Sequence, residues 1–155
     1  MKRLIKKCEL YYHLTNNENF SIDPNFNNKQ QEMGQGLYLT NLEYLKKWDN
    51  LLMHRDYVVE IEANLNIIKE DNFPSRKIMV KELISNGYNA EKMNNCKPTG
   101  DTFNRDPMDI AIKREWAKLN GYDAIEVYLD EGYQIVVLNY DKLNILSIKT
   151  IYDYI

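Results

Sequence analysis

The segment ELYYHLT, from Glu9 to Thr15, ends in a histidine and a threonine, and the chain has only one other histidine. Its aromatic and aliphatic residues favour a short β-strand. A second segment of this kind, GLYLT from Gly36 to Thr40, also ends in a threonine and leads into a helical pattern. We therefore ask whether the ends of these two predicted strands face one site.

The residues around these strands predict one long loop and one amphipathic helix. The segment from Asn16 to Gly36 is polar and rich in asparagine, so we expect a long loop. Thr40 and Glu43 have the spacing of a capping box, which predicts a helix start. Apolar residues then recur at the helical period, at Leu42, Leu45, Trp48, Leu51 and Leu52.

The rest of the chain predicts further helices and a β-rich C-terminal third. A helix starts at Pro74 and Ser75 and stops at Gly87, and a second has Asp106 as its N-cap and stops at Gly121. The residues between these helices, 88–106, have little periodicity and predict a second loop. Strands are predicted at Asp56–Leu65, Asp123–Leu129, Tyr133–Asn139 and Leu143–Tyr152, the middle two as a hairpin. This order of elements indicates an α+β fold.

Composition limits the classes of protein to consider. The 155 residues are 44% hydrophobic, which suits one domain spanning residues 1–155. A net charge of −3 argues against non-specific nucleic-acid binding. Because no apolar run is long enough for a signal peptide or a membrane span, we expect a soluble, cytoplasmic protein.

Common catalytic and metal-binding motifs are absent from the sequence. There is no glycine-rich phosphate loop, no nucleophile elbow, and no closely spaced pair of histidines or cysteines. Cys8 and Cys96 are far apart, so two reduced thiols are expected. We predict no metal site.

The order of three segments resembles the ADP-ribosyltransferase superfamily, in the branch related to diphtheria toxin and poly-ADP-ribose polymerases. These segments are YYHLT at Tyr11–Thr15, GQGLYLTNLEYLKKW at Gly34–Trp48, and GYDAIEVYLDEGYQIVVLNYDKLNIL at Gly121–Leu146. The resemblance covers most of the chain. It implies two small antiparallel sheets around an NAD cleft, with flanking helices.

The resemblance also implies roles for individual residues. His13 would bond the adenine-side ribose of NAD, and the backbone at Leu14 and Thr15 would hold the carboxamide. Tyr38 would stack on the nicotinamide ring, a flat cation that a tyrosine face attracts. The loop ending at Gly36 would cover the pyrophosphate.

The family glutamate aligns with Gln134, which can bond a ribose hydroxyl but has no charge to stabilise a ribosyl cation. Asp130 and Glu131, in the predicted hairpin turn, could supply that charge, and Glu126 is a weaker candidate. We therefore predict a catalytic group in which Asp130 or Glu131 supplies the charge and Gln134 positions the ribose.

These observations suggest a mono-ADP-ribosyltransferase that uses NAD to modify a host protein or nucleic acid. The small size suits a phage or bacterial effector, for example an anti-CRISPR-like protein or a toxin that acts in the host cytoplasm. Two alternatives stay open. The chain could be a catalytically silent module that binds NAD or ADP-ribose, or an RNA 2′-phosphotransferase, which would need more basic residues.

Overall fold

Two small sheets form one half of the molecule. The computed structural model describes residues 8–25, 32–47, 55–129 and 132–154. The first sheet has the strand order β1-β3-β7, with β1 at Glu9–Thr15, β3 at Tyr57–Ala63 and β7 at Asn144–Thr150. The second has the order β2-β6-β5-β4, with β2 at Tyr38–Leu39, β6 at Gly132–Val137, β5 at Ala124–Leu129 and β4 at Ile67–Lys69.

The second sheet is mixed, so the expectation of two antiparallel sheets is wrong for one strand pair. Strand β4, which the sequence pattern did not predict, runs parallel to β5. Three residues are too few to show alternation. Parallel neighbours need a long crossover, and the crossover contains most of the helices. These are η1 (Glu70–Asn72), α3 (Arg76–Ser85), α4 (Ala90–Asn95) and α5 (Pro107–Leu119).

The residues at the ends of helices α3 and α5 confirm the predicted start and stop signals. The Ser75 side chain accepts a hydrogen bond from the Ile78 amide and caps α3, and Asp106 accepts one from Met108 and caps α5. Gly87 and Gly121, which follow these helices, have φ angles of +90° and +80°. Glycine adopts this left-handed conformation at little cost.

Two local predictions are wrong. Helix α4 lies in the segment predicted as loop, and it has too few residues for a periodic pattern. Helix α1 (Leu42–Lys47) is capped by Asn41, whose side chain accepts from the Tyr44 amide at 2.9 Å. The Thr40 hydroxyl instead donates to the Tyr133 carbonyl at 2.8 Å, so the predicted capping box does not form. Residues 48–52 of the predicted helix lie outside the described residues.

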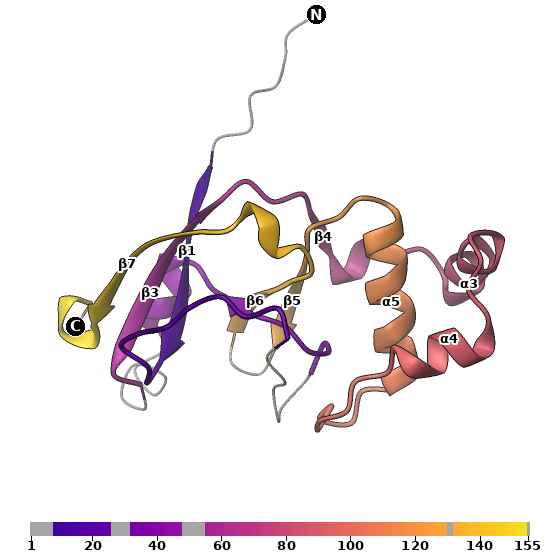
Figure 1. The fold of residues 1–155 in the computed structure, drawn as a ribbon, viewed down its shortest axis with the longest axis horizontal. Coiled ribbons are helices and arrows are strands. Elements are labelled where there is room, and N and C mark those ends of the chain that lie inside the picture. Colours follow the sequence, from indigo (N-terminus) through magenta and orange to yellow (C-terminus); the bar gives the residue numbers. More distant parts are fainter. Residues whose placement is uncertain (1–7, 26–31, 48–54, 130–131, 155) are drawn as a thin grey trace, which may run out of the picture.

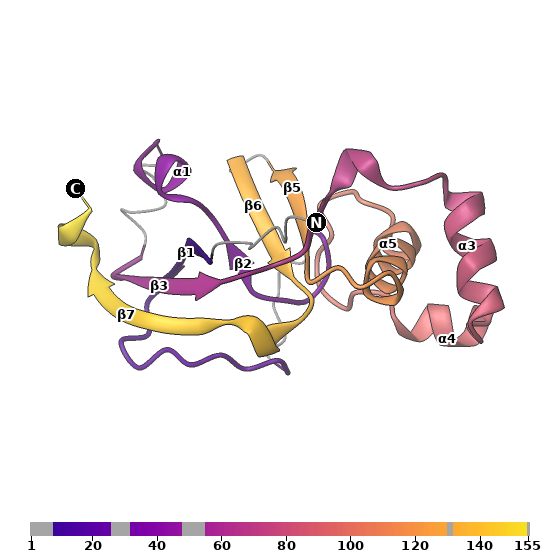
Figure 2. The same ribbon diagram turned by 90° about the horizontal axis from the view of Figure 1, so that it is seen from above.

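Three apolar clusters hold the layers together. The largest packs helices α3 and α5 on the second sheet, through residues such as Leu83, Trp116 and Val136. The second lies between the two sheets and includes Tyr11 and Ile135. A third packs α1 and the C-terminal turn η3 (Ile151–Asp153) on the outer face of the first sheet. Figures 1 and 2 show the sheets at one end of the molecule and helices α3, α4 and α5 at the other.

The described helices are all too short or too polar to span a bilayer.

Candidate functional site

The site begins where the two sheets separate. Tyr12 of β1 and Thr40 beside β2 exchange two backbone hydrogen bonds, of 2.8 and 2.9 Å. Continued antiparallel pairing would next join Leu14 to Tyr38. Instead the pairing stops at this single bridge. The His13 side chain takes the place of the next backbone contact, with its Nδ1 atom 3.0 Å from the Tyr38 carbonyl oxygen.

Backbone groups that face the gap between β1 and β2 do not pair across it. Along a strand, the N–H and C=O of alternate residues point to the same side. The backbone groups of Leu14 therefore point toward β2, as those of Tyr12 do, and those of Tyr38 point toward β1. The Tyr38 carbonyl accepts from His13. Within the described residues, no partner is found for the N–H and C=O of Leu14 or for the N–H of Tyr38.

His13 is held as a neutral ring with a defined tautomer. Burial lowers the pKa of His13 below the ordinary value of 6.5, and the positive charge of Arg55 lowers it further. The hydrogen bond to the Tyr38 carbonyl raises the pKa but does not offset the effect of burial. A carbonyl can only accept, so Nδ1 carries the proton. The Nε2 atom is then a hydrogen-bond acceptor. The ring of Phe20 packs against the imidazole, with centroids 4.9 Å apart.

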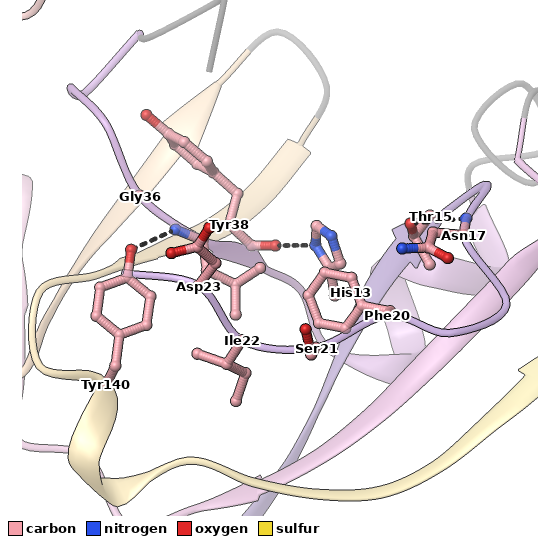
Figure 3. Close-up of a pocket in the computed structure, with 11 residues that line it drawn as sticks. His13, Thr15, Asn17, Phe20, Ser21, Ile22, Asp23, Gly36, Tyr38 and Tyr140 are labelled. Carbon is pink, nitrogen blue, oxygen red and sulfur yellow. Dashed lines mark hydrogen bonds between the residues drawn. The ribbon is translucent and has the colours of Figure 1, made fainter. Parts of the chain in front are cut away.

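A cavity of ≈ 450 Å³ opens beside His13, between the sheets and the loop that follows β1. This volume is typical of small-molecule sites. The cavity is lined by His13, Thr15, Asn17, Phe20, Ser21, Ile22, Asp23, Gly36, Leu37, Tyr38 and Tyr140 (Figure 3). It combines apolar walls with a few polar groups.

The structure brings together four of the five predicted cofactor-binding residues. His13, Thr15, Gly36 and Tyr38 line the cavity, whereas the side chain of Leu14 packs in the outer cluster. Leu14 is not among the residues that line the cavity, and only its backbone groups are directed toward β2.

Tyr38 reaches the cavity with its backbone, while its ring points away from His13 and Phe20 (Figure 3). The Tyr38 hydroxyl donates to the Gly34 carbonyl at 2.6 Å and accepts from the Met33 amide at 3.1 Å. Burial raises its pKa to about 12, so the phenol stays protonated at neutral pH.

The predicted catalytic residues divide between the two faces of the second sheet. The register Tyr38↔Val136 and the alternation of side chains place Gln134 on the same face as the Tyr38 ring. Glu126 pairs with Ile135 and faces the space between the sheets. Asp130 and Glu131 lie outside the described residues.

Several cavity residues were not singled out from the sequence. Phe20, Ile22 and Asp23 belong to the predicted loop, where no motif marks them. Tyr140, in the turn η2 (Tyr140–Lys142), accepts a hydrogen bond from the Leu37 amide at 3.0 Å. These two residues are 103 positions apart, and no local pattern joins them.

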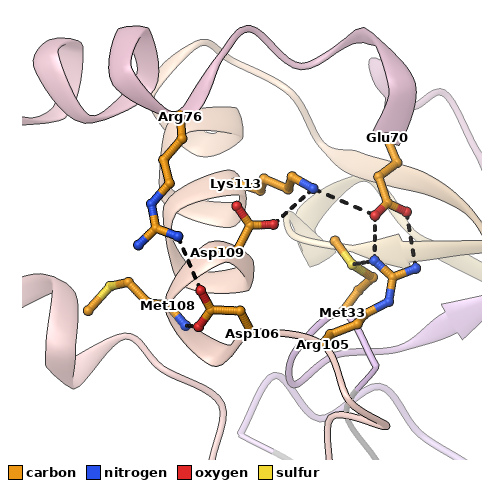
Figure 4. A network of polar contacts seen from close by, with 8 residues as sticks. All are labelled: Met33, Glu70, Arg76, Arg105, Asp106, Met108, Asp109 and Lys113. Carbon is orange, nitrogen blue, oxygen red and sulfur yellow. Dashed lines mark hydrogen bonds and ion pairs between the residues drawn. The ribbon is translucent and has the colours of Figure 1, made fainter.

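The second half of the long loop is anchored to the helical layer. Met33 is fully buried, and its carbonyl accepts from Arg114 of α5 at 3.0 Å. Its sulfur lies 3.1 Å from Nη1 of Arg105, which also pairs with Glu70 (Figure 4). Gly34 has a φ of +89°, and a Cβ there would lie 2.7 Å from the Arg114 side chain. The positive φ favours glycine at this position, and a Cβ there would also force the Arg114 side chain to move.

Within the described residues, no group of three or more histidine, cysteine, aspartate or glutamate side chains could hold a metal ion.

Comparisons with known proteins give a fold likeness at low identity. The sequence matches no protein-family model and no curated protein. Among solved structures, the chain is similar to one in the M. tuberculosis MbcT–MbcA toxin–antitoxin complex, with a TM-score of 0.51, 10% identity, and 97% of this chain and 88% of that chain covered. It also aligns with an anti-CRISPR protein, with a TM-score of 0.44, 13% identity, and 93% and 96% covered.

Proposed function

We propose that the protein binds NAD in the gap between β1 and β2 and acts as a mono-ADP-ribosyltransferase. The observation that carries the proposal is the open pair of backbone groups on Leu14, beside the neutral ring of His13. One N–H and one C=O on the same residue complement a carboxamide, which has one acceptor oxygen and one donor amine. Nicotinamide carries such a group on a flat ring.

The other contacts of the site suit the rest of the dinucleotide. A ribose hydroxyl donates a hydrogen bond, and Nε2 of His13 accepts one. The apolar walls formed by Phe20, Ile22 and Leu37 suit a flat base. Tyr38 and Gln134 lie on the other face of the second sheet, where the ring of Tyr38 would stack on nicotinamide.

Cleavage of the bond between nicotinamide and ribose develops positive charge on the ribose. Gln134 can position a ribose hydroxyl but has no charge to stabilise this cation. We assign the charge to Asp130 or Glu131, which the sequence pattern predicts in the hairpin turn. Glu126 is a less favoured candidate because it faces the space between the sheets.

The acceptor in this proposal is a host protein or nucleic acid. The order of the motifs suits an effector, either a toxin or an anti-defence protein. A fold shared with one chain of a toxin–antitoxin complex is compatible with this role. The RNA 2′-phosphotransferase alternative also uses NAD, and no residue of the described cavity lining favours it over the transferase.

A silent module that binds NAD or ADP-ribose is the second candidate, and the neutral amide at Gln134 favours it. Chromatography of free nicotinamide, after the full chain is incubated with NAD with and without host lysate, separates the two. Turnover that is lost in Asp130→Ala or Glu131→Ala while NAD binding is kept supports the transferase.

The variant Gln134→Glu sharpens this test, because it restores a carboxylate at the aligned position. Turnover that appears only in Gln134→Glu indicates a silent module. An absence of NAD binding to the wild-type chain at millimolar concentration contradicts both candidates.

A further inference from the structure

One end of the cavity has chemistry that the proposed NAD contacts leave unused. Asp23 and Tyr140 line this end, together with Gly36 (Figure 3). The two side chains come from the loop after β1 and from the turn before β7. A carboxylate and a phenol hydroxyl therefore line the same end of the cavity.

One hydrogen bond orients the Asp23 carboxylate and leaves other acceptor sites available for a ligand. Its Oδ1 atom accepts a hydrogen bond from the Asn25 amide at 2.9 Å, which fixes the carboxylate on the loop. A carboxylate has about four acceptor sites. The remaining sites can accept from a ligand, although the side chain is exposed at the rim of the cavity.

The proton of the Tyr140 hydroxyl is available to donate to a ligand. Its oxygen accepts from the Leu37 amide, so its proton is directed elsewhere. Within the described residues, no acceptor for that proton is found. Gly36 permits this arrangement, because a Cβ at that position would lie 3.3 Å from the hydroxyl and 3.0 Å from Cγ2 of Val136.

We propose that Asp23 and Tyr140 recognise the amino-bearing edge of an adenine base and so make the cavity selective for adenine over hypoxanthine. This inference rests on the proposed function for the identity of the whole ligand. Adenine offers an amine donor at N6 and an acceptor at N1 on one edge. The amine would donate to Asp23, and Tyr140 would donate to N1.

Hypoxanthine reverses this pattern, with an acceptor at O6 and a donor at N1. Its O6 would then face the Asp23 carboxylate, and its N1–H would face the Tyr140 hydroxyl. Turning the base over would restore the match, but His13 holds the ribose at the other end of the cavity. The walls of Phe20 and Ile22 suit a flat base in one plane. The Asp23 carboxylate at this end of the cavity would repel a phosphate, so a neutral base suits it better.

Isothermal calorimetry with two matched ligand pairs tests the inference. NAD is compared with nicotinamide hypoxanthine dinucleotide, and adenosine is compared with inosine. We expect the wild-type chain to prefer the adenine ligand of each pair by about 5- to 10-fold, the size of one charge-assisted hydrogen bond near solvent. Asp23→Asn should bring the ratio close to one, because an amide can turn to donate to O6.

Glu18→Gln is the matched control. It removes one charge from the same loop, and Glu18 contacts Tyr57 rather than the cavity, so the preference should persist. Equal affinities for each pair in the wild-type chain, or a preference that Asp23→Asn leaves unchanged, would overturn the inference. Failure of both nucleosides and both dinucleotides to bind would also overturn it. Selective adenosine binding without NAD binding would support the base contact and contradict the proposed function.

Discussion

Replacing His13 with phenylalanine tests the centre of the site. The variant keeps an aromatic ring against Phe20 but removes the Nδ1 donor that lies 3.0 Å from the Tyr38 carbonyl. It also removes the Nε2 acceptor. The change therefore separates the polar role of the ring from its packing.

The cost of His13→Phe follows from these contacts. One lost hydrogen bond costs about 1 kcal/mol, and the Tyr38 carbonyl left without its donor brings the total to roughly 2 kcal/mol. In a chain of this length, ~2 kcal/mol lowers the melting temperature by roughly 4–8 °C. Loss of the acceptor for a ribose hydroxyl should weaken NAD binding about fivefold or more.

Thermal unfolding and calorimetric NAD titration of the same samples measure both effects. Leu83→Ala is the control, because Leu83 of α3 is buried in the cluster between the helices and the second sheet and does not line the cavity. It should destabilise the fold by ~2 kcal/mol or more and leave NAD affinity unchanged. If His13→Phe keeps the wild-type melting temperature and affinity, the reasoning about this ring is wrong. An equal loss of affinity in Leu83→Ala would assign the effect to general destabilisation.

The pH dependence of stability gives a second measurement on the same variant. The folded-state pKa of His13 lies below its ordinary value of 6.5, so the unfolded chain binds a proton more readily. The stabilising contribution of the neutral ring is complete above pH 6.5 and decreases as the pH falls from 6.5 toward the folded-state pKa. His13→Phe should lack this component in urea unfolding curves collected at pH 5.5 and 7.5.

Three further predictions concern the frame of the site. Gly36→Ala should destabilise the fold by ~1–2 kcal/mol and weaken ligand binding. The added Cβ would lie 3.1 Å from the Val137 carbonyl oxygen and 3.3 Å from the Tyr140 hydroxyl. Urea unfolding measures the first effect and NAD titration the second. Asp123→Asn should cost ~2–3 kcal/mol in urea unfolding, because this carboxylate, 4% exposed, accepts from Lys142 at 2.7 Å. A wild-type unfolding midpoint in the variant would show that the carboxylate contributes little. Hydrogen exchange should show that NAD protects residues 16–25, which have few apolar residues to bury; equal exchange with and without NAD would argue against a cover over the site.

Much of the local structure could be predicted from the sequence because its causes are local. Four of the seven residues of β1 are tyrosine or leucine, and the structure has this strand with the predicted bounds. Ser75 and Asp106 act on amides two or three positions away, so the helix starts were visible as short patterns. Short elements such as β4 and α4 were missed because three or six residues contain too little periodicity.

The site was predicted only in part. The order of the motifs singled out His13, Gly36 and Tyr38, and the structure places all three around one cavity. The same order could not show that the ring of Tyr38 points away from His13. That direction depends on the bonds of its hydroxyl to the turn at Met33 and Gly34, which Arg114 holds from helix α5.

The sequence by itself determined most of the strands, the capped starts of α3 and α5, and the position of a rare histidine at a strand end. Only the tertiary structure decided that β1 and β2 pair once and then separate, and that Tyr140 closes the cavity against Leu37. Hydrogen bonds within an element join residues a few positions apart, so composition and spacing encode them. The gap and the cavity depend on contacts between residues 25 to 103 positions apart, and such contacts form only when the layers pack together.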